Sequence, residues 1–407
     1  MAAAIALAQS GFDVELFESR AYLGGRASSF PLSDSEHIDN CQHVLLACCT
    51  NLVDFYRRLG AESQIRFHSE FYFLEPGGKL STLRPGLMGF LGFGCLAFKE
   101  KLAVLRALLA LRAQQHRTDL DSFTMLDWLR EQRQPERAIR RFWGQILVSA
   151  VNEELDQMAA SHGFQVFLTA FFGAPEASHM GVPAVPLSQL YSAQAWSRLP
   201  HATLRFRTPV DRIENSTVEA GGRGYQGDAV ICALPFERAG QVAPQLELDF
   251  SGWRHSPITG IHLWFDRAVT KLPHATLVDR TIQWFFNKSE GRQLQLVVSA
   301  SRSLTELPRQ QVIDLALGEL AEFLPEAGSA KLEMAHVVKE VRATFSAVPG
   351  LEAMRPLQTT AIDNLFLAGD WTRTGWPATM EGAVRSGYLA AEAAAASLGR
   401  PARYLIP

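Results

Sequence analysis

The amino-terminal segment places the strongest constraint on how this chain can fold. Residues 1–9, MAAAIALAQ, are rich in alanine and leucine and predict a helix that ends at Gly11. Residues 12–18, FDVELFE, predict a short buried strand that finishes in the acidic side chain of Glu18. Helix, glycine, strand and carboxylate form the second half of a dinucleotide-binding βαβ unit, in which the carboxylate accepts hydrogen bonds from the adenosine ribose. We therefore expect Glu18 to bind a ribose.

The first half of such a unit would lie before Met1. An opening strand and a GxGxxG turn normally lead into the helix and let the backbone approach the pyrophosphate. A signal peptide explains residues 1–10 less well, because they lack a basic segment and their apolar part is short. We expect a start codon placed too late or a truncated gene, with weak or absent cofactor binding by the chain as printed.

A glycine pair and an arginine follow the carboxylate, at Gly24, Gly25 and Arg26. The glycines permit a tight approach to a phosphate, and the arginine can then form paired hydrogen bonds with a pyrophosphate. A simple glycine turn is the alternative. The position just after a strand that ends in glutamate favours phosphate binding.

A second nucleotide-type turn lies near the carboxyl terminus, where residues 364–387 read NLFLAGDWTRTGWPATMEGAVRSG. A short strand over 365–368 ends in Gly369 and Asp370, and a helix is predicted over 378–397 after Pro377. The positive end of that helix would stabilise a ring that gains negative charge on reduction. A flavin is such a ring, so this segment predicts a flavin site.

Composition and charge narrow the classes of partner. The length of 407 residues and the hydrophobic content of 47% predict a folded protein of about two domains. The net charge of -3 gives no global positive field for nucleic acid. The five cysteines show no CxxC spacing, so we expect neither disulfides nor a metal site, and a cytoplasmic location. No apolar run is long enough to span a membrane.

The two motifs together resemble the FAD-dependent amine oxidase and phytoene desaturase superfamily. Within it, residues 39–60, DNCQHVLLACCTNLVDFYRRLG, and the string PATMEGAV are most similar to the squalene-associated desaturases, the hydroxysqualene dehydroxylases. The resemblance implies an α/β fold with two lobes. A Rossmann-like FAD-binding domain (1–70, 200–250 and 350–400) would carry an inserted substrate domain (71–199 and 251–349) of helices and an antiparallel or mixed sheet.

The resemblance also assigns the cofactor contacts. The matching positions are Glu18 at the ribose, Gly24, Gly25 and Arg26 along the pyrophosphate, Val210 at the adenine, Gly369 and Asp370 at the phosphate and ribityl chain, and Thr379 and Met380 at the flavin ring. Cys41 stands where related sequences commonly have a glycine beside the flavin. No cysteine follows Cys232, so FAD is expected to bind noncovalently.

The implied reaction is the removal of the hydroxyl of hydroxysqualene to give squalene, in hopanoid biosynthesis. His43 is the candidate acid, with a structural hydrogen-bonding role as its alternative. Gln42 is a candidate for holding water or the hydroxyl. Glu381 is a further candidate for proton transfer, or else supports the dipole of a helix.

Three other functions remain open. An oxidative carotenoid or phytoene desaturase would use the same fold in the opposite direction, and a flavin amine oxidase would often carry a lysine near the flavin that no sequence pattern locates. A flavin-fold remnant without catalysis is the alternative from another class.

The expected partners are a polyisoprenoid substrate and enzymes of the squalene pathway. Residues 87–98 and the helix over 102–115 form either buried core or a peripheral contact with the inner face of the cytoplasmic membrane.

Overall fold

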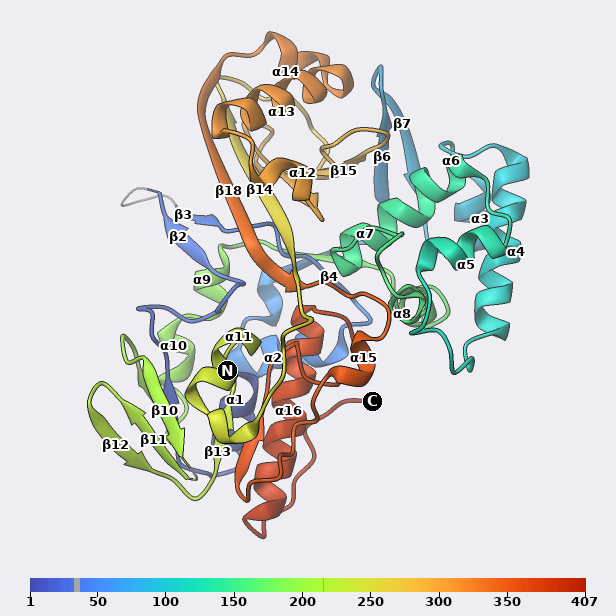
Figure 1. Ribbon diagram of the computed structural model, residues 1–407. Coiled ribbons are helices and arrows are strands. Elements are labelled where there is room, and N and C mark those ends of the chain that lie inside the picture. The colour runs from blue at the N-terminus through green and yellow to red at the C-terminus, as the bar shows by residue number, and fades with distance from the viewer. Residues whose placement is uncertain (33–36, 215) are drawn as a thin grey trace.

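The computed structural model describes residues 1–32, 37–214 and 216–407, which form two lobes (Figure 1). One lobe contains α1 (Ala2–Gln9) and α16 (Met380–Ser397), and the two ends of the chain lie in it. The other contains a large mixed sheet and a group of helices. The predicted α/β fold with two lobes is confirmed, and of the two sheet types that the sequence left open the mixed one is observed.

Small side chains bring α1 and α16 into close contact. A Cβ placed on Gly387 would lie 2.9 Å from the Cβ of Ala2 and 3.1 Å from the backbone nitrogen of Ala3. After α1 the chain turns at Gly11, whose φ of +76° favours glycine. The helix predicted over residues 1–9 is thus confirmed, and its alanines allow the close packing.

Parallel strand pairs from distant parts of the sequence complete this lobe. β1 (Val14–Phe17) pairs with β9 (Ala202–Arg205), and β13 (Val230–Cys232) pairs with β19 (Leu365–Leu367). A separate antiparallel sheet contains β10 (Val210–Glu214), β11 (Thr217–Ala220) and β12 (Arg223–Gln226). α9 (Leu187–Leu190), which the sequence assigned to the substrate side, packs into the core around α1. The domain boundaries as such stay a prediction.

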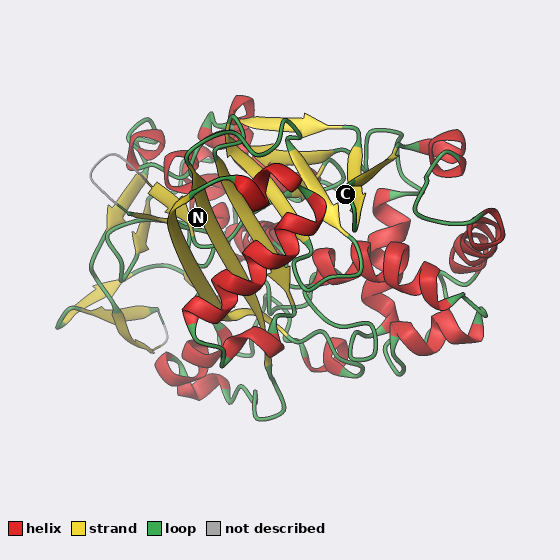
Figure 2. Cartoon of the chain, turned by 90° about the horizontal axis from the view of Figure 1, so that it is seen from above, coloured by secondary structure: helices red, strands yellow, loops and turns green. Residues whose placement is uncertain are grey.

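A seven-stranded sheet dominates the second lobe. Its order is β18 (Leu332–Phe345), β14 (His255–Phe265), β17 (Gln293–Ser299), β16 (Trp284–Ser289), β15 (His274–Leu277), β6 (Phe71–Glu75) and β7 (Lys79–Leu83). All neighbouring pairs are antiparallel except β15 with β6. One face is covered by α12 (Arg302–Thr305), α13 (Arg309–Phe323) and α14 (Pro325–Ser329), and Figure 2 shows helices lying across the strands. The other face turns toward the first lobe.

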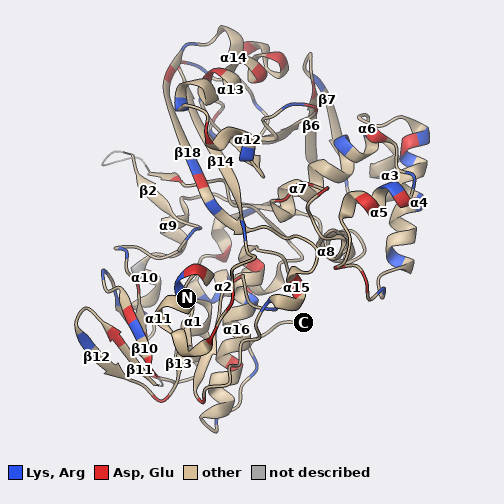
Figure 3. Ribbon diagram, in the orientation of Figure 1, with Lys and Arg blue, Asp and Glu red and all other residues tan. Residues whose placement is uncertain are grey.

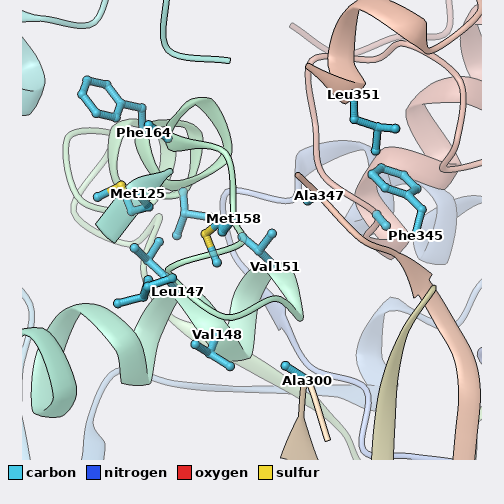
Figure 4. Packing of buried hydrophobic residues seen from close by; sticks show 14 of the residues in the cluster. Met125, Leu147, Val148, Val151, Met158, Phe164, Ala300, Phe345, Ala347 and Leu351 are labelled. Atoms are coloured by element: carbon cyan, nitrogen blue, oxygen red, sulfur yellow. The ribbon is translucent and has the colours of Figure 1, made fainter. Parts of the chain in front are cut away.

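The helical part of this lobe contains α3 (Gly86–Leu91), α4 (Phe98–Ala113), α5 (Met125–Glu131), α6 (Glu136–Ala138), a π-helical turn (Ile139–Gly144), α7 (Gln145–Val151) and α8 (Ala160–Ala170). Figure 4 shows its core, which continues to Ala300 and Phe345 of the sheet region. The helical segment is interrupted between α7 and α8 at Asn152, which ends α7 and adopts φ of +60°. Its side-chain amide donates to Ser256 O at 3.0 Å and accepts from Ala300 N at 2.7 Å, so the break joins the helices to the sheet.

The remaining elements are β2 (Ser29–Pro31), β3 (His37–Asp39), β4 (Leu45–Leu46), α2 (Thr50–Leu59), β5 (Ile65–His68), β8 (Met180–Pro183), α10 (Ala193–Trp196), α11 (Phe236–Val242), α15 (Leu351–Met354) and two 3-10 turns (Glu62–Gln64, Pro244–Leu246). Among the described residues, no helix combines the length and apolar character that crossing a membrane requires.

Candidate active site

Glu18 lies at the carboxyl end of β1, where the sequence predicts a ribose-binding carboxylate. Its side chain is half-buried, and Oε1 accepts hydrogen bonds from Arg20 N at 2.8 Å and from the Ser19 hydroxyl at 3.2 Å. The carbonyl of Glu18 accepts from Thr208 N at 2.9 Å, and Val210 begins β10 two residues later. The structure therefore brings Glu18 and the predicted adenine contact to the same end of the lobe.

The glycine pair forms a turn with left-handed backbone. Gly24 and Gly25 have φ of +116° and +59°. A Cβ on Gly24 would lie 2.4 Å from Ala27 O, so a side chain there needs a change of backbone. A Cβ on Gly25 would meet no atom within 4 Å, so this residue borders open space. The turn thus leaves room for close approach of a ligand, as the predicted phosphate contact requires.

Arg26 joins the two motifs from opposite ends of the sequence. Its Nη2 lies 2.5 Å from Oδ1 of the buried Asp370, and Nη1 donates to Ala343 O at 2.8 Å. Burial acts to lower the pKa of Arg26, but Asp370 outweighs it and raises that pKa, so the guanidinium stays charged. Its other N–H groups are suited to a phosphate. The predicted pyrophosphate and ribityl segments therefore meet at one ion pair.

Gly369 and Thr379 fix the turn before α16. Gly369 has φ of +139°, and its N–H donates to Ser386 Oγ at 2.8 Å. Thr379 is the N-cap, because its Oγ1 accepts from Gly382 N at 3.0 Å. The helix consequently begins at Met380, two residues later than the pattern predicts. Its positive end lies at the residues predicted to face the flavin ring.

Glu381 binds the first turn of α2. Its carboxylate accepts from Leu52 N at 2.7 Å, from Asn51 Nδ2 at 2.9 Å and from Asn51 N at 3.3 Å. Burial raises its pKa, although these hydrogen bonds oppose the shift. The geometry matches the helix-supporting alternative for Glu381, and its proton-transfer role stays a prediction.

Two candidate catalytic residues, Gln42 and His43, follow β3, and the structure places Lys288 beside Gln42. Gln42 Oε1 accepts from Lys288 Nζ at 3.0 Å, and the same ammonium lies 3.9 Å from Asp39 Oδ2. Burial lowers the pKa of Lys288, and Asp39 opposes this shift. Sequence reasoning missed Lys288, because it lies in strand β16, far from Gln42 in sequence, and no local motif marks it. Only the sheet brings the two together.

His43 donates a hydrogen bond to the backbone of Cys41. Its Nδ1 lies 2.9 Å from Cys41 O, which can only accept, so Nδ1 carries the hydrogen. Burial lowers the pKa of His43 from its ordinary value, which favours the neutral ring near pH 7. In that state Nε2 accepts rather than donates. A role for His43 as the acid would need the disfavoured protonated form, and it stays a prediction.

An apolar patch lies beside these polar groups, on the face of the sheet that turns toward the first lobe. Cys41, Met180, Phe286 and Val297 form its buried centre, and Trp284 stacks on Phe286 with ring centroids 5.9 Å apart. Burial raises the pKa of the Cys41 thiol to about 12, so Cys41 acts here as a neutral packing residue. Aromatic faces and apolar surroundings suit a hydrocarbon and tolerate positive charge on it.

A row of buried polar side chains crosses the same sheet face and was also missed from sequence. His262 and Gln295 are cross-strand neighbours on β14 and β17. His262 Nε2 bonds to Asp39 O at 3.1 Å, while its Nδ1 and both amide atoms of Gln295 have no protein partner among the described residues. Burial lowers the pKa of His262 to about 4. The His262 ring and the Gln295 amide are therefore buried and uncharged, and His262 contacts Asp39.

The cofactor residues fit FAD. A strand-end carboxylate for the ribose, a glycine turn that borders open space, a charged guanidinium and the capped start of a long helix occur in the order that the nucleotide, pyrophosphate and flavin require.

Comparisons with known proteins agree with this arrangement. The family model described as flavin containing amine oxidoreductase matches residues 1–395. The hydroxysqualene dehydroxylase of Sinorhizobium fredii is 28% identical over 417 residues, covering 97% of this chain and 95% of that protein. The probable zeta-carotene desaturase of Synechococcus elongatus is 26% identical and covers 97% and 96%. In fold, cyclohexylamine oxidase from Brevibacterium oxydans is similar with a TM-score of 0.74 at 18% identity, covering 98% and 97%.

Proposed function

This chain belongs to the family of flavin-containing amine oxidoreductases and is an FAD-dependent oxidoreductase; we propose that it converts hydroxysqualene to squalene. Reduced FAD supplies the hydride when it is bound. The hydride replaces the hydroxyl on carbon, and the hydroxyl leaves as water after it has taken up one proton. The protein must therefore provide a proton donor and a surface that keeps other water away from the reacting carbon.

The observation that supports this proposal is the ammonium of Lys288 beside an apolar aromatic patch. Lys288 Nζ is fixed by Gln42, and Phe286, two residues earlier on the same strand, belongs to the patch. A polyisoprenoid chain would lie on the patch and bring its hydroxyl to the ammonium. Removal of a hydroxyl needs such a donor, whereas removal of hydrogen from a hydrocarbon does not.

The residues then have distinct roles. Lys288 donates the proton to the leaving hydroxyl, and Gln42 orients the ammonium. Trp284 and Phe286 exclude water and stabilise positive charge that develops on the substrate. We place the reaction in the cytoplasm at the inner face of the membrane, with enzymes of the squalene pathway as partners.

Oxidative desaturation of a carotenoid is the second candidate. The similarity to zeta-carotene desaturase over nearly the whole chain favours it, because that identity is close to the identity with hydroxysqualene dehydroxylase. The two reactions move the hydride in opposite directions, so the redox state of the flavin separates them.

The test is anaerobic incubation of the protein, loaded with photoreduced FAD, with hydroxysqualene, followed by mass spectrometry for squalene. A parallel sample holds oxidised FAD with phytoene or zeta-carotene. We expect squalene in the first sample, at no more than one per flavin. Desaturated carotenoid in the second sample alone would support the other reaction, and a protein that binds no FAD would favour a noncatalytic remnant.

A further inference from the structure

The helical part of the second lobe presents large apolar side chains to solvent. On α3, Leu87 and Met88 are 58% and 79% exposed, and on α4, Phe98, Leu102 and Leu109 are 67%, 43% and 67% exposed. We call these five residues the α3–α4 face. Grouped exposure of this kind marks an interaction surface rather than scattered surface residues.

The apolar residues of α4 lie on two opposite sides of the helix. Ala103, Val104, Ala107 and Leu111 are buried in the core. Phe98, Leu102 and Leu109 are spaced by four and seven residues, so they fall within a stripe of about 40° on the other side. The stripe is therefore not an edge of the core but a second apolar face.

Basic side chains flank this stripe. At 100° per residue, Lys99 and Arg106 lie along one flank and Lys101 and Arg112 along the other. Glu100 lies on the buried side, where its carboxylate accepts from Ala97 N at 2.7 Å. Figure 3 shows the blue Lys and Arg positions along α4.

The charge of this region differs from that of the whole chain. Residues 84–117 contain a single acidic residue, Glu100, against these Lys and Arg residues: Arg84, Lys99, Lys101, Arg106, Arg112 and Arg117. The whole chain carries a net charge of -3. Arg84 and Arg117 form ion pairs with acidic residues outside this range, and the Lys101 ammonium donates to Leu91 O at 2.6 Å. Lys99, Arg106 and Arg112 form no ion pair among the described residues, so they carry the positive charge beside the exposed apolar stripe.

We propose that the α3–α4 face docks on an anionic lipid surface, with α4 lying in the plane of the interface. The stripe would enter the boundary between headgroups and acyl chains, and the flanking Lys and Arg would meet lipid phosphates on both sides. A groove in a protein partner would match the stripe but gives no reason for basic residues on both flanks. The docking does not depend on the substrate, so it is tested without turnover.

The experiment is co-sedimentation of the full chain with vesicles of phosphatidylcholine alone or mixed with phosphatidylglycerol. We expect binding to the anionic vesicles that weakens as salt is raised. The variant Phe98→Ser/Leu109→Ser should bind at least about tenfold more weakly. Lys99→Gln/Arg106→Gln should lose the preference for anionic vesicles. Each variant is checked by circular dichroism and thermal unfolding.

Matched controls remove similar groups elsewhere. Leu357→Ser removes an apolar side chain that is 53% exposed outside this face, and Arg223→Gln/Lys331→Gln removes two exposed charges. Both should bind vesicles as the unchanged protein does. The proposal is overturned if the unchanged protein stays in the supernatant with anionic vesicles, or if Phe98→Ser/Leu109→Ser binds like Leu357→Ser. Self-association without vesicles that Phe98→Ser/Leu109→Ser abolishes would identify a second copy as the partner and also overturn it.

Discussion

The Lys288 side chain is half-buried, and burial disfavours the charged form of its ammonium group. The ammonium is held by Gln42 and lies near the Asp39 carboxylate, at the border of the apolar patch. A lysine whose pKa is lowered releases its proton more readily than an exposed lysine, which suits an acid that must work near neutral pH. The Lys288 ammonium is therefore the group on which the proposed reaction depends.

Replacing Lys288 by Gln should lower single-turnover formation of squalene by about 10²-fold or more, because no proton then reaches the hydroxyl. Flavin content should not change. In the unchanged protein the rate should fall as the pH rises through the pKa of Lys288, because only the protonated form donates, and that fall should occur below the ordinary pKa of lysine.

The control for this change is Lys271→Gln, which removes an exposed lysine. His43→Gln distinguishes the two candidate donors. If Lys288→Gln keeps the full rate while His43→Gln loses it, the proton comes from the histidine.

Arg26 and Asp370 test the link between the two cofactor motifs. Arg26→Gln leaves the buried Asp370 carboxylate without its charged partner, so unfolding free energy should fall by about 1–2 kcal/mol, at the low end because Arg26 is partly exposed. Flavin content, read from absorbance per protein, should fall as well. Arg57→Gln, which breaks an exposed pair with Glu62, should change neither quantity comparably. Full flavin content in Arg26→Gln would remove Arg26 from the pyrophosphate site.

At the scale of elements, α16 and α2 begin at the same place and share one carboxylate. Glu381 in the first turn of α16 accepts from the first turn of α2, and Tyr388 of α16 donates to Asp54 of α2 at 2.9 Å. A carboxylate between two positive helix ends is favourable for both dipoles. This joint positions the start of α16, where the flavin ring is expected.

Glu381→Ala should lower the free energy of unfolding by about 1–3 kcal/mol, because buried N–H groups of Asn51 and Leu52 lose their acceptor. Urea unfolding at neutral pH measures this. If Glu381 only supports the helices, squalene formed per bound flavin should stay at the level of the unchanged protein. A large loss of rate in variant protein with full flavin content would instead assign proton transfer to Glu381.

Elements with a local signal could be predicted, and elements made by distant pairing could not. α1, β1, β19 and α16 follow from alanine content, short apolar runs, glycine and a cap. β18 is a long edge strand with exposed and half-buried positions, so its pattern carries no clear alternation. Lys288, His262 and Gln295 become site residues only through the register of β14, β16 and β17. No sequence spacing encodes that register.

At the scale of the whole molecule, buried histidines link stability to pH. Burial is the main cause that lowers the pKa of His162 to about 3 and of His262 and His274 to about 4. His162 lies in α8, His262 in β14 and His274 in β15. Protonation of these rings therefore affects both the helical part and the sheet of the second lobe. In the unfolded chain the same rings take up protons near their ordinary pKa of 6.5.

The unfolded state therefore binds more protons than the folded state between about pH 6.5 and 4. The stabilisation by these neutral rings is fully present above pH 6.5 and is lost as the pH falls toward the folded-state values, by up to about 1.4 kcal/mol per pH unit for each ring. Urea unfolding from pH 7.5 to 4.5 should show this decline. His162→Gln should make the decline shallower, whereas His116→Gln, at an exposed position, should leave it unchanged. An equal slope in His162→Gln and the unchanged protein would show that His162 is protonated in the folded state, and carboxylates would then account for the acid sensitivity.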